Sequence, residues 1–148
     1  MIARLAILIL LLVSPINAVA SDRMTIFVDD TMRGALQELA ARFERATIHR
    51  VTPTFASSAQ QAERIESGTH AALVLLAGAG ATDRLDRRGL LEGKTRTALV
   101  ARRNGSTAIV YELALVIARD RPATRVLYDF LRAAEAGEVY RRHGFLTE

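Results

Sequence analysis

The clearest alternation of apolar and polar positions spans residues 25–47. Residues 25–28 form a short β-branched and aromatic run, which predicts a strand. After a polar break at residues 29–31, apolar residues recur at i, i+3, i+4 and i+7, which predicts a helix with one apolar face. These residues are Leu36, Leu39, Ala40 and Phe43. We therefore expect a strand that turns directly into a helix, with Asp30 or Thr31 as the N-cap.

The remaining patterns extend this unit. Strands are expected at 50–55, 71–77, 95–102 and 107–118, and a loop at 78–81. Helices are expected at 59–66 and from Thr82 or Asp83 to Gly89. A last helical section begins at 120, and Gly137 is expected to break it before 139–143. Pro53 indicates that its strand lies at a sheet edge or that the proline lies near a strand end, because proline cannot donate to a ladder. The order β-α-β-α-β-α-β-β-α predicts an α/β domain with a mostly parallel sheet flanked by helices.

Residues 1–20 have the pattern of a signal peptide. Arg4 precedes the apolar run 5–13, and Ala18-Val19-Ala20 fits the small-x-small cleavage rule. Cleavage there would leave one domain, 21–148, in the periplasm. An uncleaved membrane anchor is the alternative interpretation.

Composition narrows the functional classes. The chain has 20 Lys and Arg residues (19 without Arg4) against 16 Asp and Glu, and no Trp or Cys. The charges are dispersed, so we expect a solvated surface and no nucleic-acid partner. His49, His70 and His143 lack ligand spacing, and no nucleophile–base pair can be assembled. We therefore expect no metal, no cofactor and no enzymatic activity.

Two strand–turn–helix units carry the candidate site. Thr31 follows the first strand, and Ser57 and Ser58 follow the second. Their hydroxyls and the adjacent helix amides would meet at one sheet edge, where a small oxyanion could bind. The same residues could serve only as helix caps. Asp29 and Asp30 also leave the interpretation open, since they would repel an anion, fill its role themselves, cap the helix or attract a cation.

Three segments resemble the periplasmic molybdate-binding proteins of ABC importers, which belong to the type II solute-binding-protein superfamily. They are TIFVDDTMRGALQELAARFE, TFASSAQQAERIESG and YDFLRAAEAGEVYRRHGF. The resemblance implies a periplasmic-binding-protein fold in which Thr31 and Ser58 bind the oxyanion. The chain departs from the family at Asp29 and Asp30, where small residues are usual, and at Ala72, where an acidic residue is usual.

The largest departure from the family is the absence of the second lobe, which would belong between about residues 103 and 107. What remains resembles one lobe closed by the C-terminal strand and helices, and nothing matches Tyr111 to the tyrosine that the family uses. Half a cleft excludes water poorly and cannot close on a ligand.

Two hypotheses follow from the resemblance. The first is an exported protein related to molybdate or tungstate capture for an ABC permease. The second is a ligand-free interaction or sensor module built on the one lobe, which could self-associate through the former inter-lobe face.

Overall fold

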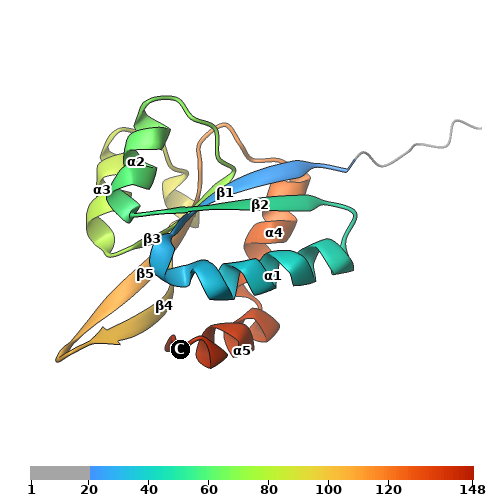
Figure 1. The fold of residues 1–148 in the computed structure, drawn as a ribbon. Coiled ribbons are helices and arrows are strands. Elements are labelled where there is room, and N and C mark those ends of the chain that lie inside the picture. Colours follow the sequence, from blue (N-terminus) through green and yellow to red (C-terminus); the bar gives the residue numbers. More distant parts are fainter. Residues whose placement is uncertain (1–20) are drawn as a thin grey trace, which may run out of the picture.

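The computed structural model describes residues 21–148 as one α/β lobe (Figure 1). Its elements are β1 (Arg23–Asp29), the 3-10 turn η1 (Asp30–Met32), α1 (Arg33–Ala46), β2 (Arg50–Ala56), α2 (Ser58–Glu66), β3 (Leu73–Ala77), α3 (Ala79–Arg87), the 3-10 turn η2 (Gly93–Thr95), β4 (Thr97–Asn104), β5 (Thr107–Leu115), α4 (Pro122–Arg132) and α5 (Ala134–Arg142). The predicted signal peptide lies outside the described residues. Within them, no helix is long and apolar enough to cross a membrane.

The five strands form one sheet in the order β2-β1-β3-β5-β4. The α/β lobe is confirmed, but the sheet is mixed rather than mostly parallel. β1 pairs in parallel with β2 and β3, whereas β5 is antiparallel to both β3 and β4. The β4–β5 pair is antiparallel because the two strands form a hairpin, and β5 also runs opposite to its other neighbour, β3. Pro53 lies on the edge strand β2, as predicted.

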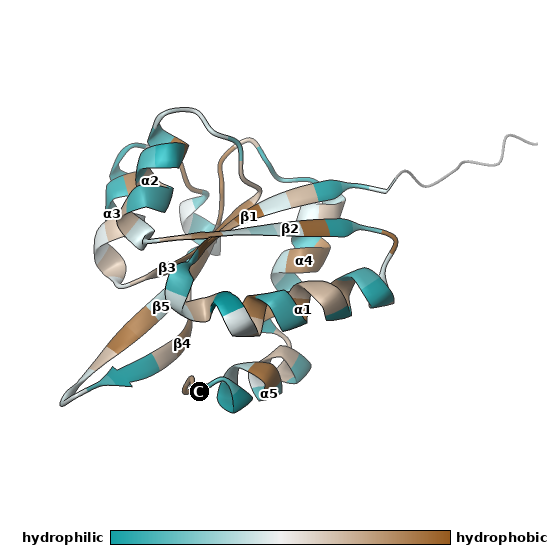
Figure 2. Ribbon diagram, viewed as in Figure 1, coloured by the Kyte–Doolittle hydropathy of each residue, from teal (hydrophilic) through white to brown (hydrophobic). Residues whose placement is uncertain are grey.

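Helices cover both faces of the sheet. Alternate strand residues enter two separate cores, as the period of two in a strand requires. Ile26, Leu73 and Leu113 pack on the face that α1, α4 and α5 cover. Phe27 and Val74 pack on the opposite face, beneath α2 and α3. Hydrophilic and hydrophobic residues accordingly alternate along the helices in Figure 2. Four of the five buried residues of α1 are those that its period predicted, and the fifth is Ala35.

Two predicted helix boundaries are wrong. Helix α3 begins at Ala79 rather than in the neighbourhood of Thr82, because Gly78 adopts a positive φ of 71° and starts the helix early. Gly137 does not break the last helix and lies inside α5, whose Ala136, Val139 and Tyr140 are buried. The break occurs at Ala133, which is extended with ψ 159°. In both places tertiary packing outweighs the low helix propensity of glycine.

Candidate functional site

The candidate site lies where the parallel strands β1, β2 and β3 end. Asp29 is the last residue of β1, and Ser58 opens the helix that follows β2. Asp29 pairs in register with Ala56, so the two strand ends bring the turns after them together. This is the edge at which open α/β sheets bind ligands.

The Asp29 carboxylate occupies the centre of this site. Its Oδ1 accepts from the Thr31 amide at 3.0 Å and from the Thr31 hydroxyl at 2.6 Å. Its Oδ2 accepts from the Ser58 amide at 3.2 Å and from the Ser58 hydroxyl at 2.6 Å. Four neutral donors therefore bind one carboxylate that is only 7% exposed. We call Asp29, Thr31 and Ser58 the Asp29 cradle.

Two further donors support the hydroxyls of the cradle. Since the single Thr31 hydroxyl proton is directed to Asp29, the Tyr111 hydroxyl, 2.7 Å away, donates to Thr31 Oγ1. The Ala77 amide likewise donates to Ser58 Oγ at 2.8 Å. Each oxygen of Asp29 thus receives one amide and one hydroxyl, and each hydroxyl accepts a hydrogen bond in turn. Tyr111 is itself 1% exposed and packs edge-on against Phe145.

The charge of Asp29 is balanced by dipoles rather than by a cation. Within residues 21–148, no salt bridge reaches Asp29. Arg33, the nearest arginine in sequence, pairs with Asp30 at 2.5 Å and lies 4.5 Å from the centre of the Phe55 ring. Neutral amides and hydroxyls at a helix start are the donor type that holds oxyanions in proteins.

The structure separates the three predicted site residues. Thr31 and Ser58 both bind the Asp29 carboxylate. Ser57 instead serves as the N-cap of α2, and its hydroxyl accepts a hydrogen bond from the Gln60 amide at 3.2 Å. Ser57 and Gln60 form a capping box, in which each side chain bonds the backbone amide of the other residue. Gln61 instead donates to the carbonyls of Val28 and Thr54, at 3.0 and 2.7 Å, and fixes α2 against the strand ends.

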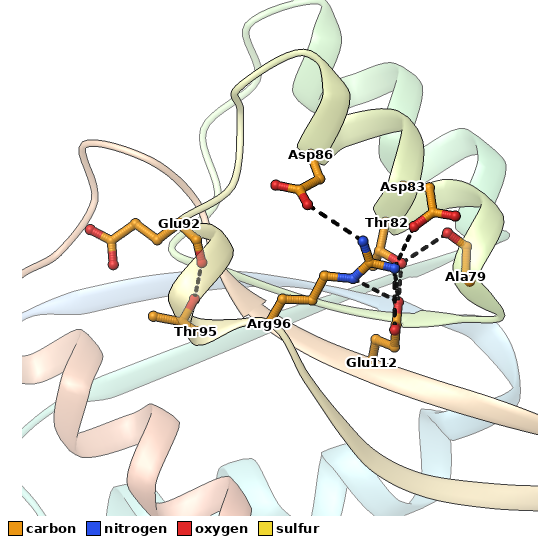
Figure 3. Close-up of polar contacts among 8 residues, drawn as sticks. All are labelled: Ala79, Thr82, Asp83, Asp86, Glu92, Thr95, Arg96 and Glu112. Atoms are coloured by element: carbon orange, nitrogen blue, oxygen red, sulfur yellow. Dashed lines mark hydrogen bonds and ion pairs between the residues drawn. The ribbon is translucent and has the colours of Figure 1, made fainter.

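A second polar cluster lies on the other face of the sheet (Figure 3). Arg96 donates to Glu112 Oε2 at 2.9 Å and to Asp83 Oδ1 at 2.6 Å, and its Nη1 lies 3.5 Å from Asp86 Oδ2. Thr82 donates a further hydrogen bond to Glu112. Burial opposes the charge of Arg96, yet Asp83 and Glu112 outweigh it and raise its pKa. We call these five residues the Arg96 cluster; it ties α3 to β5.

Neither region offers a metal site. Across residues 21–148, no group of three or more His, Asp or Glu residues is arranged to hold a metal ion. The carboxylates of the Arg96 cluster are already engaged by a guanidinium. In both regions the carboxylates are therefore stabilised by groups of the chain itself, by amides and hydroxyls around Asp29 and by a guanidinium in the Arg96 cluster.

The family of the chain follows from a comparison of its sequence. Residues 24–108, more than half of the chain, match the model of a family described as bacterial extracellular solute-binding protein. The chain belongs to this family. The match contains both turns of the Asp29 cradle. No curated protein matches the chain.

Solved structures of solute-binding proteins share the fold. A protein described as the substrate-binding domain of a molybdenum ABC transporter from Clostridium difficile is 11% identical, with a TM-score of 0.80 over 86% of this chain and 100% of that one. The Azotobacter vinelandii periplasmic molybdate-binding protein is 11% identical, with a TM-score of 0.76 over 84% and 99%. The sulfate-binding protein SubI from Mycobacterium tuberculosis is 11% identical, with a TM-score of 0.68 over 84% and 86%. At this identity the likeness shows the fold alone.

Sequence reasoning missed two members of the site. Tyr111 lies 80 residues from Thr31 and carries no local motif that would connect them. Ala77 contributes only its backbone amide, which no side-chain pattern could indicate. A signal for Asp29 was present, since a carboxylate beside two hydroxyl-bearing helix starts could fill the oxyanion position itself, but the sequence left this open among other roles.

Proposed function

We propose that this chain is an exported, non-enzymatic solute-binding lobe whose oxyanion position is taken by its own Asp29 carboxylate. In this proposal it acts as an interaction module rather than as a carrier of molybdate or tungstate. The four hydrogen bonds from Thr31 and Ser58 to Asp29 carry the argument. Membership of an extracellular family supports export to the periplasm.

A free oxyanion competes poorly with a tethered carboxylate. It would have to take the same four donors while giving up translational and rotational freedom, which costs about 4–15 kcal/mol on association. Asp29 gives up none of that freedom, because it is part of the chain. The internal ligand therefore prevails at ordinary concentrations of the external one.

Repulsion adds to this competition. At 4 Å and an effective dielectric constant near 20, two like unit charges repel by about 4 kcal/mol, and a dianion doubles that figure. An oxyanion that approached Thr31 and Ser58 with Asp29 still in place would meet this repulsion. Asp29 must therefore leave the cradle before an oxyanion enters it.

Thermal unfolding of the expressed full chain and its Asp29→Ala variant tests the proposal. Each is measured with and without millimolar molybdate, tungstate and sulfate. We expect no ligand-dependent rise in Tm for the wild type and a rise for Asp29→Ala. At a ligand concentration of one hundred times Kd, the stabilisation of the variant would be about 2.7 kcal/mol.

Two controls make the result specific. Asp30→Ala removes a neighbouring carboxylate that pairs with Arg33 outside the cradle, and it should remain unresponsive. Ser58→Ala in the Asp29→Ala background should abolish the rise in Tm. Equal rises for the wild type and Asp29→Ala would refute the proposal, because Asp29 would then not compete with the ligand.

Oxyanion capture is the second candidate function. It is favoured by the convergence of the Thr31, Ser58 and Tyr111 hydroxyls, which suits an oxyanion if the Asp29 side chain turns outward. In this alternative the chain would deliver molybdate or tungstate to an ABC permease. A wild-type Tm that rises with molybdate but not with sulfate would support it.

The surface left for a partner is the β4–β5 hairpin, which projects from the lobe in Figure 1. The turn at residues 104–107 lies where the second lobe would belong if the resemblance holds, so in this proposal the hairpin is the former inter-lobe face. Val110 and Leu146 are 41% and 50% exposed there. Self-association through these side chains would raise the mass measured by light scattering with concentration, and Val110→Lys should reverse that rise. A constant monomer mass would contradict self-association.

A further inference from the structure

The two edges of the sheet differ in how their outward backbone groups are used. The edge strands are β2 and β4. On β2, the Arg50 amide donates to the Asp22 carbonyl on the side of β1, so the backbone of Val51 and Pro53 faces outward. Glu44 Oε1 accepts from the Val51 amide at 2.9 Å, and a proline has no amide hydrogen to offer. Both outward positions of β2 therefore lack a donor for another strand.

The β4 edge is occupied at one position and open at the next. Ala101 exchanges two backbone hydrogen bonds with Leu146, of 2.9 Å from its amide and 2.7 Å to its carbonyl. Because inward and outward groups alternate along a strand, the amide and carbonyl of Arg103 also point outward. Among residues 21–148 neither of these two groups forms a hydrogen bond, since the chain turns away at Gly144, whose φ is 86°. An open edge of this kind can accept a further strand.

The arginines of the β4 edge have no carboxylate partner. Within the described part of the chain, no salt bridge reaches Arg102 or Arg103. Arg103 is exposed. The Arg102 guanidinium lies 4.7 Å from the centre of the Phe145 ring and donates to the His143 carbonyl at 3.4 Å. The positive charge of this edge is therefore available to an acidic partner.

An apolar hollow lies beside these charges. It has a volume of about 160 Å³ and is lined by residues 98–101 of β4, Val110 and residues 146–148. Val110 lies directly opposite Ala101, and opposed residues of two strands place their side chains on the same face. A strand that pairs with Ala101 in place of Leu146 would therefore direct its own side chain towards Val110. An apolar side chain fits this position.

We propose that the β4 edge binds an extended acidic segment of a partner protein, which adds antiparallel to β4 and takes the place of Leu146. This inference rests on the interaction function proposed above and names its partner. The segment has an apolar residue opposite Ala101 and acidic residues opposite Arg102 and Arg103. The incoming strand forms two backbone hydrogen bonds at Ala101, as Leu146 does, and two more at Arg103. The exchange of one strand for the other therefore gains hydrogen bonds and ion pairs.

A second copy of the chain fits the same edge less well. Pairing of two β4 strands would gather Arg102 and Arg103 of both copies on one two-stranded ribbon. Like charges across a strand pair are unfavourable, and charged edges hinder pairing between copies. The same arginines attract an acidic strand.

NMR of the expressed full chain with three synthetic peptides tests the proposal. The first is TEEVTVT, whose glutamates and first valine match the three positions. The second is TKKVTVT, and the third is TEEVTVT with an N-methyl group on its first valine. We expect saturable binding of the first peptide, slower hydrogen exchange at the Arg103 amide, and faster exchange at the Leu146 amide, which loses its bond to Ala101. The other two should bind roughly tenfold more weakly or worse, because one has the wrong charge and one cannot donate to the Ala101 carbonyl.

A charge reversal on the protein provides the matched variant. Arg103→Glu should raise the Kd of TEEVTVT about tenfold and lower that of TKKVTVT, because it reverses the sign of one contact. Arg87→Glu, which reverses an exposed arginine on α3, should leave both Kd values unchanged. Equal binding of TEEVTVT and TKKVTVT, or no loss on N-methylation, would overturn the proposal. A mass that rises with concentration while the Arg103 amide is protected without peptide would also overturn it, since the occupant would then be a second copy.

These outcomes are separate from the test of the Asp29 cradle. The peptide titrations are made with Asp29 in place and without oxyanions. Peptide binding together with a molybdate-dependent rise in the Tm of the wild type would refute the closed cradle and support the β4 edge. Absence of peptide binding, with a wild type that does not respond to molybdate, would refute the edge and leave the cradle closed.

Discussion

The Asp29 cradle and the Arg96 cluster hold a poorly exposed carboxylate in opposite ways. Asp29 is bound by four neutral donors, whereas Glu112 is bound by a guanidinium and a hydroxyl. Tyr111 and Glu112 are adjacent on β5, so the alternation of the strand sends one side chain to each region. The neutral donors around Asp29 could bind another anion in its place, whereas the guanidinium of Arg96 is already paired with the carboxylates of its own cluster.

Removing the guanidinium should have the largest effect on stability. Arg96→Met leaves Glu112, Asp83 and Asp86 without their shared cation. Because Arg96 and Glu112 are 19% and 17% exposed, we expect a loss of about 2–3 kcal/mol in the free energy of unfolding, below the range for fully buried pairs. Urea denaturation measures it, with Arg87→Met as a control that should change by less than about 0.5 kcal/mol.

A double substitution tests the electrostatic cause. Arg96→Met with Glu112→Leu removes both charges and should recover part of the lost stability, since no uncompensated carboxylate remains. A double variant that loses the sum of both single effects would show that packing, not charge, explains the loss.

Removing the internal carboxylate should have a smaller effect that an anion reverses. In buffer without oxyanions, Asp29→Ala should lose about 1–3 kcal/mol, because hydrogen bonds to a charged group contribute roughly that amount. Millimolar molybdate should recover this loss in urea denaturation and should leave the loss in Arg96→Met unchanged. Recovery in both variants would indicate a general salt effect and erase the distinction between the two regions.

Tyr111→Phe should lose about 1 kcal/mol, since it removes one hydrogen bond to Thr31 and keeps the ring. The loss should shrink in the Asp29→Ala background, where the Thr31 hydroxyl is free to turn. Tyr140→Phe is the matched control, because the Tyr140 hydroxyl donates to the Leu131 carbonyl away from the cradle. Its cost, from the same urea curves, should be equal in both backgrounds. Equal costs for Tyr111→Phe would contradict the coupling.

A third carboxylate, outside both regions, should have the smallest effect. Hydrogen bonds from Arg142 and His143 lower the pKa of Glu38 from 4.5 to about 2 and join α1 to α5. Its folded pKa lies below the unfolded one, so its contribution is complete above about pH 4.5 and is lost as the pH falls towards 2. Glu38→Gln should flatten this acid limb of stability in thermal melts at stepped pH, and an unchanged limb would contradict the assignment.

The apolar and polar patterns along the chain were sufficient to predict most of the helices and strands of the fold. A strand was predicted at residues 71–77, and the structure contains β3 there, buried from Leu73 to Leu76. The prediction was wrong at Gly80 and Gly137, which lie inside helices. Local propensity is worth about 1 kcal/mol at a glycine, less than the burial of neighbouring side chains contributes.

The sequence alone determined the alternation of strands and helices and placed Thr31 and Ser58 at two helix starts. It also placed a carboxylate beside them, but left open whether Asp29 fills the site or repels a ligand. Only the tertiary structure decided this, because the answer depends on the pairing of β1 with β2, which brings Ser58 to within 2.6 Å of Asp29 across 29 residues. Hydrogen bonds act over about 3 Å, and local patterns do not encode distances between segments far apart in the chain.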